Sequence, residues 1–274
     1  MYSKVYVEIS NICNMNCSFC HGHSRESRAM TEAEFSRILQ QLQGKTQYIY
    51  YHLMGEPLTH RLLPRFLQLA KEAGFRSVIT TNGTLLHKTG ETLLCAGVHK
   101  VNISLHSQET EENLPGYLQR AAAFADLAGK YGTLVSFRLW NKGCDDGKNA
   151  IVEAALRELL PGEWTENSRG YRIRDKLYIE WGERFAWPDA AAEKVGERVF
   201  CYGMQDHFGI LCDGTVVPCC LDSDGVIALG NVFRQDLQQI LDSDRAQAMV
   251  KGFQCRTPSE DLCRRCGYAK RFTK

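Results

Sequence analysis

The chain has 274 residues, with 33 Lys and Arg side chains against 32 Asp and Glu, so its formal net charge is +1. Such a balanced charge gives no overall field that favours nucleic acid or an anionic surface, which argues against nucleic acid as the main partner. No apolar stretch approaches the roughly 18 residues of a membrane span, and the N-terminus lacks the basic and apolar regions of a secretion signal. The sequence therefore predicts a cytoplasmic protein with no membrane partner.

Short apolar or aromatic runs alternate with segments of helical periodicity over the first two thirds of the chain. The predicted strands are Val5–Ile9, Tyr48–Leu53, Ser77–Thr81, Lys100–Leu105, Val135–Leu139 and Leu177–Glu180. The predicted helices are Thr31–Leu42, Leu62–Ala73, Leu85–Cys95, Tyr117–Lys130 and Asn149–Leu159. This alternation predicts an α/β fold with a parallel sheet and right-handed crossovers, either curved into a barrel or doubly wound. The pattern alone does not choose between the two.

The last third of the chain is less regular. Pro161–Glu197 mixes Gly, Trp and charged residues without periodicity and is interpreted as a bridge. Phe208–Leu211 and Thr215–Pro218 flank an Asp-Gly turn and predict a β-hairpin, and Gln235–Lys251 predicts an amphipathic helix. We therefore expect a large domain over residues 1–180 and a smaller one over residues 181–274.

Twelve cysteines form two groups on either side of a cysteine-poor middle. They are Cys13, Cys17, Cys20, Cys95, Cys144, Cys201, Cys212, Cys219, Cys220, Cys255, Cys263 and Cys266. Disulfides are rare in a reducing cytosol, so ligation of metals or clusters is the natural use of so many thiols. The two groups predict two such sites.

The first group, Cys13, Cys17 and Cys20, has the spacing C-x3-C-x2-C and follows the first predicted strand. Three thiolates in one loop can hold three irons of a cubane cluster and leave the fourth iron open to another ligand. An open iron indicates a catalytic cluster, whereas a cluster closed by four cysteines would indicate a structural role or electron transfer alone. The alternative is a zinc site completed by His21 or His23.

This spacing, with the aromatic Phe19 just before the third cysteine, resembles the radical S-adenosylmethionine (SAM) superfamily. The resemblance implies a [4Fe-4S] cluster whose open iron is chelated by SAM, and a one-electron cleavage of SAM to methionine and a 5′-deoxyadenosyl radical. It implies a partial (β/α)6 TIM barrel with the site at the C-terminal ends of the strands. It also implies an electron donor of the flavodoxin or ferredoxin type.

The same resemblance assigns residues at the strand ends to SAM. In Met54-Gly55-Glu56-Pro57, which is similar to a Gly-Gly-Glu motif that binds the SAM amino group, Met54 replaces the first glycine. Comparable positions after the third and fourth strands contact the ribose and methionine parts of SAM, and here they are Thr81, Asn82, Ser104 and His106. From the residues alone, Gly-Glu-Pro is an ordinary turn and Thr-Asn-Gly is a helix-capping turn.

Arg138 lies within the fifth predicted strand, where an inward charge needs a partner. The resemblance implies that the SAM carboxylate is the partner of Arg138. The alternative partner is an acidic side chain in a structural salt bridge. His52, on the second predicted strand, is a further candidate for the substrate cavity.

The second group of cysteines is similar to the first half of the SPASM extension. Twelve residues separate Cys201 from Gly214, four separate Gly214 from Cys219, and a C-x2-C pair follows at Cys263 and Cys266. Because the sequence holds no cysteine after Cys266, it resembles the shortened twitch version, which implies one auxiliary [4Fe-4S] cluster on these four cysteines. Either Cys220 or Cys255 could replace one of them. Without the resemblance, a zinc ribbon is the competing interpretation.

These observations predict a radical SAM enzyme that abstracts a hydrogen atom and, assisted by its auxiliary cluster, carries out a two-electron oxidation of a small molecule or a peptide. One alternative is a radical SAM/SPASM maturase that modifies a peptide or protein. The alternative from another class is a zinc-stabilised binding module. No catalytic side chain is assigned.

Overall fold

The computed structural model describes residues 1–272, and its backbone is organised around one sheet. The strand order is β11-β10-β9-β1-β2-β3-β4-β5-β8-β7-β6. The strands are β1 Lys4–Val7, β2 Tyr48–Tyr50, β3 Arg76–Thr81, β4 Lys100–Ser104, β5 Leu134–Lys142, β6 Thr165–Asn167, β7 Gly170–Arg174, β8 Leu177–Glu183, β9 His207–Ile210, β10 Thr215–Val217 and β11 Gly230–Asn231. Neighbouring strands from β9 to β8 in this order all run parallel.

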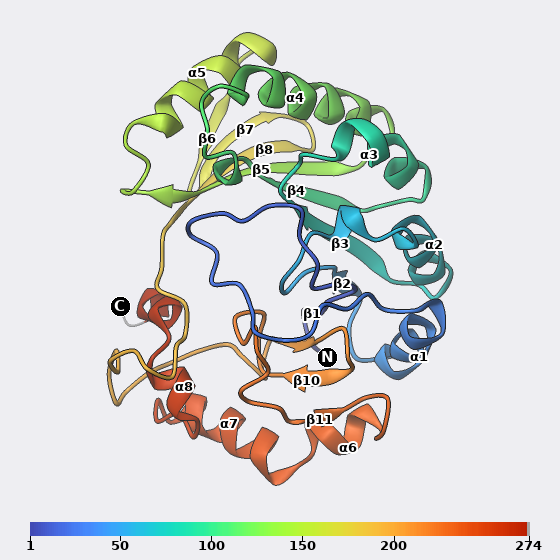
Figure 1. Cartoon of the computed structure of the whole chain (residues 1–274), viewed down its shortest axis with the longest axis vertical. Helices are drawn as coiled ribbons and strands as arrows, with labels where there is room; N and C mark the ends of the chain where they lie inside the picture. Colours follow the sequence, from blue (N-terminus) through green and yellow to red (C-terminus); the bar gives the residue numbers. More distant parts are fainter. Residues whose placement is uncertain (273–274) are drawn as a thin grey trace.

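The sheet lines the inside of a crescent, and helices cover its outer face (Figure 1). The helices are α1 Glu32–Leu42, α2 Leu63–Glu72, α3 Leu86–Cys95, α4 Leu114–Lys130, α5 Lys148–Leu159, α6 Leu237–Leu241, α7 Asp244–Gln254 and α8 Asp261–Arg264, with 3-10 turns η1 Pro57–Thr59, η2 Leu105–Ser107 and η3 Gly267–Phe272. Helices α1 to α5 all lie on the outer face, whereas a doubly wound sheet carries helices on both faces. The prediction of a partial barrel is confirmed.

The predicted barrel elements match the structure closely because their signals are local. The capping box at Thr31 is present: Glu34 N donates to the Thr31 hydroxyl and Thr31 N donates to the Glu34 carboxylate. Buried Phe35, Ile38 and Leu42 then repeat along α1 at helical spacing and face the sheet. Strand β5 runs three residues beyond its predicted end, to Lys142.

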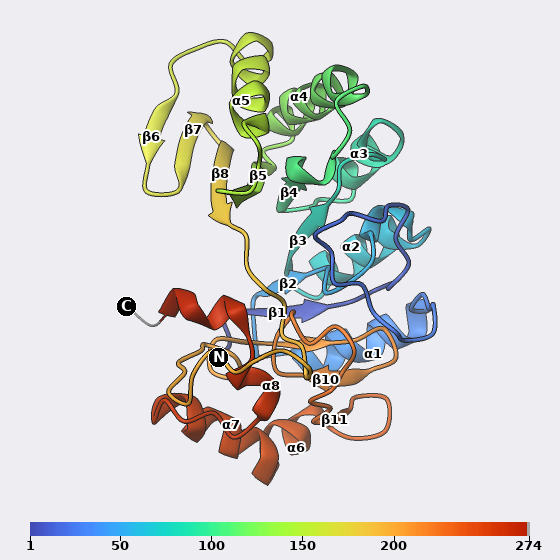
Figure 2. The same cartoon turned by 60° about the vertical axis from the view of Figure 1, so that its left-hand side comes forward.

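Two expectations for the last third are wrong. The bridge Pro161–Glu197 contains β6 and β7, which extend the sheet from β8 as antiparallel strands (Figure 2). All residues of β6 are exposed, so no apolar alternation marks it in the sequence. The helix Gln235–Lys251 is two helices, α6 and α7, because Ser243 accepts a hydrogen bond from Ala246 N and starts a new helix.

The predicted hairpin forms as β9 and β10, and β9 adds to the barrel sheet. Residues Lys4–Val7 of β1 pair in parallel with residues His207–Ile210 of β9. Buried Val5, Val7, Phe208 and Ile210 on these strands belong to the same apolar core as the helices α1 to α5. The sheet thus continues across the predicted division between residues 1–180 and 181–274.

Within the described residues, no helix is long and apolar enough to cross a membrane.

Candidate active site

The first cysteine loop leaves the C-terminal end of β1 and extends beyond the strand ends, where it crosses the opening of the crescent in the view of Figure 1. Cys13 and Cys20 are exposed and Cys17 is half-buried. The Cys20 amide donates to the Cys17 carbonyl at 3.0 Å, and the Ser18 amide donates to the Glu109 carboxylate at 2.9 Å. Burial, Glu109 and the two neighbouring thiols raise the pKa of the Cys17 thiol to about 11. The three thiols therefore lie close enough to oppose one another's ionisation.

A buried ion pair holds the C-terminal part of this loop against the end of β1. Arg25 Nη2 lies 2.8 Å from Glu8 Oε2, and the Glu8 side chain is fully buried at the end of β1. The same carboxylate accepts hydrogen bonds from Met54 N at 3.1 Å and Cys212 N at 3.2 Å, while Arg25 Nε donates to the Ser223 carbonyl. Four segments meet there. Glu8 was not among the predicted site residues, although a lone acidic residue in an apolar strand indicates a buried partner of opposite charge.

Gly55 and Glu56 lie directly beneath the cysteine loop. Gly55 has φ of +75°, and a Cβ there would lie 2.4 Å from the Ser10 carbonyl oxygen, so only glycine allows this approach. Glu56 accepts hydrogen bonds from Leu58 N at 2.9 Å and from Asn82 N at 2.7 Å. Burial raises the pKa of Glu56 to about 7, although these hydrogen bonds act in the opposite direction. Glu56 thereby joins the β2 and β3 loops.

The other predicted SAM contacts follow β3 and β4. Asn82 Nδ2 donates to Asn14 Oδ1 of the cysteine loop at 2.9 Å, and Thr81 Oγ1 accepts from Gly83 N. The His106 ring lies 4.8 Å from the Phe19 ring, centroid to centroid, and Ser104 lines the same cavity as both. The structure brings all of these residues to the C-terminal ends of the strands, as expected. Their roles toward SAM stay a prediction.

A cavity of about 1010 Å³ occupies the middle of the molecule. Of the predicted site residues, it is lined by Phe19, Ser104, His106, Arg138, Cys201, Cys219, Cys263 and Cys266, and His52 also lines it. The other predicted site residues do not line the cavity. Three of them are the loop cysteines themselves, and the rest lie next to the cysteine loop: Gly55, Glu56, Thr81 and Asn82. Burial, Arg138 and Lys4 lower the pKa of His52 to about 3, so this imidazole is neutral.

The second set of thiols gathers on the opposite side of this cavity. The burial of Cys219 raises its pKa, and the neighbouring thiols of Cys201, Cys220, Cys263 and Cys266 raise it further. Gly203 N donates to Cys201 Sγ at 3.3 Å, and the amides of Tyr268 and Ala269 donate to Cys266. Cys220 lies within this set and is hydrogen-bonded to Tyr6, whereas Cys255 is exposed and does not line the cavity.

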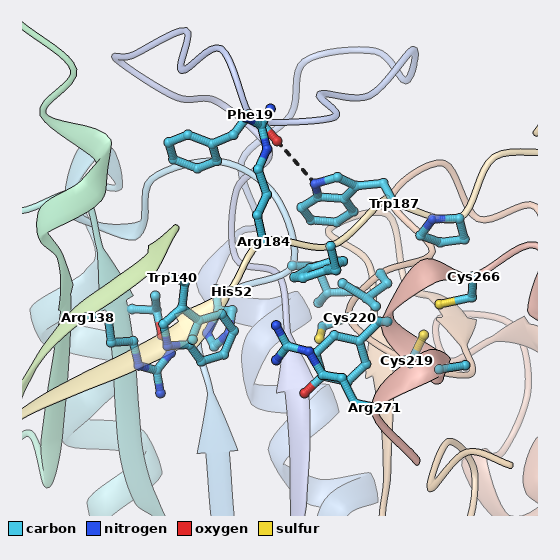
Figure 3. Close-up of a pocket in the computed structure, with 18 of the residues that line it drawn as sticks. Phe19, His52, Arg138, Trp140, Arg184, Trp187, Cys219, Cys220, Cys266 and Arg271 are labelled. Carbon is cyan, nitrogen blue, oxygen red and sulfur yellow. Dashed lines mark hydrogen bonds between the residues drawn. The ribbon is translucent and has the colours of Figure 1, made fainter. Parts of the chain in front are cut away.

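Residues 185–187 connect the two thiol sets. Trp187 Nε1 donates to the Phe19 carbonyl at 3.2 Å, next to Cys20 (Figure 3). Ala186 packs on Gly267, next to Cys266, so closely that a Cβ on Gly267 would lie 2.6 Å from the Ala186 carbonyl oxygen. The Phe185 ring lies 5.0 Å from the Tyr268 ring. This connection was not predicted, because residues 185–187 have no periodicity or motif in the sequence.

Both sets have donors that suit iron–sulfur clusters. Thiolates are the usual ligands of such clusters, and amide hydrogen bonds to their sulfurs tune them. No three His, Cys, Asp or Glu side chains in residues 1–272 are placed to share a single metal ion.

Sequence comparison assigns both regions to known families. The radical SAM superfamily matches residues 7–128, and SPASM, an iron–sulfur cluster-binding domain, matches residues 201–267. The chain therefore contains a radical SAM domain and a SPASM-type domain. Its radical SAM domain binds SAM and a [4Fe-4S] cluster, and its SPASM-type domain binds additional iron–sulfur.

Radical SAM proteins with solved structures share the fold. BtrN in complex with AdoMet and 2-DOIA superposes with a TM-score of 0.64 at 19% identity, over 97% of this chain and 93% of that chain. SuiB of Streptococcus suis bound to SAM gives 0.65 at 20% identity, over 100% of this chain and 75% of that chain. At these identities the likeness describes the fold alone.

The curated relatives match only part of this radical SAM protein. GTP 3′,8-cyclase of Chlorobaculum tepidum is 29% identical over 146 residues, which is 48% of this chain and 44% of the relative. AdoMet-dependent heme synthase of Methanosarcina barkeri is 31% identical over 132 residues, 45% of this chain and 38% of the relative. The chain thus spans less than half the length of these two relatives.

Replacing Glu56 by Gln is expected to weaken SAM binding while leaving the iron content unchanged. The substitution removes one of the two carboxylate oxygens and the negative charge that Glu56 would carry when paired with the SAM ammonium. A hydrogen bond to a charged group contributes about 1.5–3 kcal/mol, or roughly tenfold to a hundredfold in affinity. Calorimetric titration of SAM into anaerobic protein measures the change. Glu112→Gln, at an exposed position, is the matched control. Equal SAM affinity in both variants would place the SAM amino group elsewhere.

Proposed function

We propose that this chain is a radical SAM oxidoreductase that removes a hydrogen atom, and then an electron and a proton, from a substrate held in the central cavity. The observation that carries the proposal is the placement of one cavity between the two thiol sets. Phe19 of the first cysteine loop borders it on one side, and Cys201, Cys219, Cys263 and Cys266 border it on the other. A substrate bound there is close to both.

The chain's own residues have three tasks in this proposal. Cys13, Cys17 and Cys20 would hold the cluster that binds SAM, and together the reduced cluster and SAM supply a 5′-deoxyadenosyl radical. Glu56, Asn82 and the Phe19–His106 pair would orient SAM at the loop. Cys201, Cys219, Cys263 and Cys266 would hold one auxiliary [4Fe-4S] cluster with no open iron, suited to accept the electron left on the substrate.

A peptide-modifying activity is the second candidate. Two structural neighbours were solved with peptides, SuiB with the precursor peptide SuiA and anSMEcpe with the peptide Kp18Cys. The cavity of about 1010 Å³ is at the upper end of the range of about 300–1,000 Å³ that is usual for small-molecule sites. Such a volume accommodates a small molecule or a short peptide segment. In either case we propose a flavodoxin- or ferredoxin-type electron donor.

Anaerobic purification tests the proposed function. The protein is expected to be brown, to contain iron and sulfide at about eight each per chain from two four-iron clusters, and to cleave SAM to 5′-deoxyadenosine after reduction. Iron, sulfide and zinc analysis together with chromatography of the SAM products provide the measurements. Colourless protein with stoichiometric zinc and no SAM cleavage contradicts the proposal.

A further inference from the structure

Trp140 lines the central cavity between the side chains of Arg138 and Arg271 (Figure 3). This part of the cavity wall, which also includes His52, Lys100 and Glu180, is called the floor below. The guanidinium carbon of Arg138 lies 4.9 Å from the centroid of the Trp140 ring, and that of Arg271 lies 6.0 Å from it. Arg138 comes from β5 and Arg271 from η3, so two distant segments supply them. An arginine beside an aromatic ring still presents its N–H donors at the guanidinium edge.

The positive charges on this floor are only partly compensated. Glu180 lies 3.9 Å from Arg138 Nε and 3.9 Å from Lys100 Nζ, so one carboxylate serves two cations, beyond hydrogen-bonding distance of both. Arg271 donates to the Glu183 carbonyl, and no carboxylate of residues 1–272 forms an ion pair with it. Lys100 and Arg138 thus share Glu180, and among residues 1–272 Arg271 has no carboxylate as an ion-pair partner.

Two buried polar nitrogen atoms that line the cavity region have no hydrogen-bond partner within the described part of the chain, and that of Arg138 is a donor. Arg138 Nε and His52 Nδ1 are both buried, and neither makes a hydrogen bond. His52 lies beside Tyr6, with 5.2 Å between ring centroids, and the Tyr6 ring also lines the cavity. Leaving such groups unpaired and out of water costs free energy, and a ligand with acceptor oxygens would offset this cost.

We propose that this floor binds an anionic group of the substrate, a carboxylate or a phosphate, between Arg138 and Arg271. The inference rests on the proposed function, because it takes the cavity as the substrate site. Arginine presents paired donors that match the oxygens of both kinds of anion, and the Trp140 ring gives an adjoining apolar part of the substrate a surface to pack against. The substrate class is therefore an anionic molecule, or a peptide segment with an acidic group.

The orientation of Arg138 favours this ligand over the SAM carboxylate that the resemblance assigns to it. Its guanidinium lies on the side of Trp140 away from Phe19 and the cysteine loop, where SAM is expected (Figure 3). Burial lowers the pKa of Arg138, and Glu180, the acidic neighbour with an opposing effect, also lines the cavity. Because the two assignments differ in whether SAM and a second anion compete, they can be separated by experiment.

The test is calorimetry on the holoenzyme with SAM present at saturation. Succinate and inorganic phosphate are the anionic probes, and succinamide is the neutral counterpart of succinate. We expect saturable binding of at least one anion, no binding of succinamide, and at least a tenfold loss of anion affinity in Arg138→Gln and in Arg271→Gln. Tighter binding of phosphate supports a phosphate-bearing substrate, and tighter binding of succinate supports a carboxylate. Arg65→Gln, which removes an exposed ion pair with Glu32, is the matched control.

Three results would overturn the inference: no anion binds, both cavity variants bind the anions as well as the control does, or the anion binds only when SAM is absent. The last result would indicate that Arg138 binds the SAM carboxylate. Arg271→Lys, which keeps the charge and loses the paired donors, should retain part of the affinity if Arg271→Gln fails to fold. SAM cleavage is measured on the same preparations, so a failure of the proposed function shows as lost cleavage and is distinct from a failure of anion binding.

Discussion

Replacement of any one of Cys13, Cys17 or Cys20 by Ala is expected to abolish SAM cleavage while the auxiliary cluster stays in place. With only two thiolates left in the loop, the remaining cluster cannot keep three irons ligated by protein and one open to SAM. The second thiol set lies across the cavity from this loop and shares no ligand with it. The expected loss exceeds that from any single contact to SAM.

Iron analysis, electron paramagnetic resonance of the reduced protein and chromatography of 5′-deoxyadenosine measure this outcome. Each variant should retain about four irons, the content of one cubane cluster. Cys95→Ala is the matched control, because Cys95 is an exposed thiol at the end of α3 outside both sets. SAM cleavage at the control rate in any of the three variants contradicts the ligand assignment.

Replacing Cys263 and Cys266 together by Ala is expected to remove about four irons and to prevent substrate oxidation, while SAM cleavage without substrate turnover continues. The first cysteine loop keeps its own supports, the Glu8–Arg25 pair and the hydrogen bond from Ser18 to Glu109. The double variant also leaves in place Trp187 and the Phe19 carbonyl that it contacts. The double variant should therefore still cleave SAM but no longer accept an electron from the substrate.

The competing explanation is that the auxiliary cluster only stabilises a segment of about 70 residues that buries too little core of its own. A folded double variant that still oxidises substrate at normal yield favours this structural role. A folded variant that makes 5′-deoxyadenosine without oxidised product favours the redox role. Cys255→Ala is the control, since Cys255 is exposed at the end of α7, and loss of iron in this control would instead make Cys255 a ligand.

The parts of the fold and the site that could be predicted have local signals. The spacing of Cys13, Cys17 and Cys20 fits within one loop, and the capping box at Thr31 and the apolar positions of α1 lie within a few turns of chain. The parallel order of strands followed from the alternation of strands and helices. The same reasoning placed Glu56, Asn82 and Ser104 at one end of the sheet, because parallel strands end together.

What could not be predicted depends on contacts between distant segments. Arg271 and Trp140 are 131 positions apart, and nothing in either neighbourhood indicates that they meet. Trp187 lies in a stretch without periodicity, so its hydrogen bond to Phe19 emerges only in three dimensions. Strand β6 is short and fully exposed, which removes the alternation that identifies a strand. The break at Ser243 shows that one good N-cap can interrupt a continuous apolar pattern.

The pairing of β9 with β1 makes the cysteine-rich C-terminal segment part of the fold of the barrel itself. Without β9, β1 would become an edge strand, with the backbone groups of Lys4–Val7 unpaired along one side and open to pairing with another chain. The Glu8 carboxylate would also lose the Cys212 amide. The two regions matched by separate families therefore share one sheet and one apolar core, and we expect truncation before residue 201 to expose the edge of β1 and to promote aggregation.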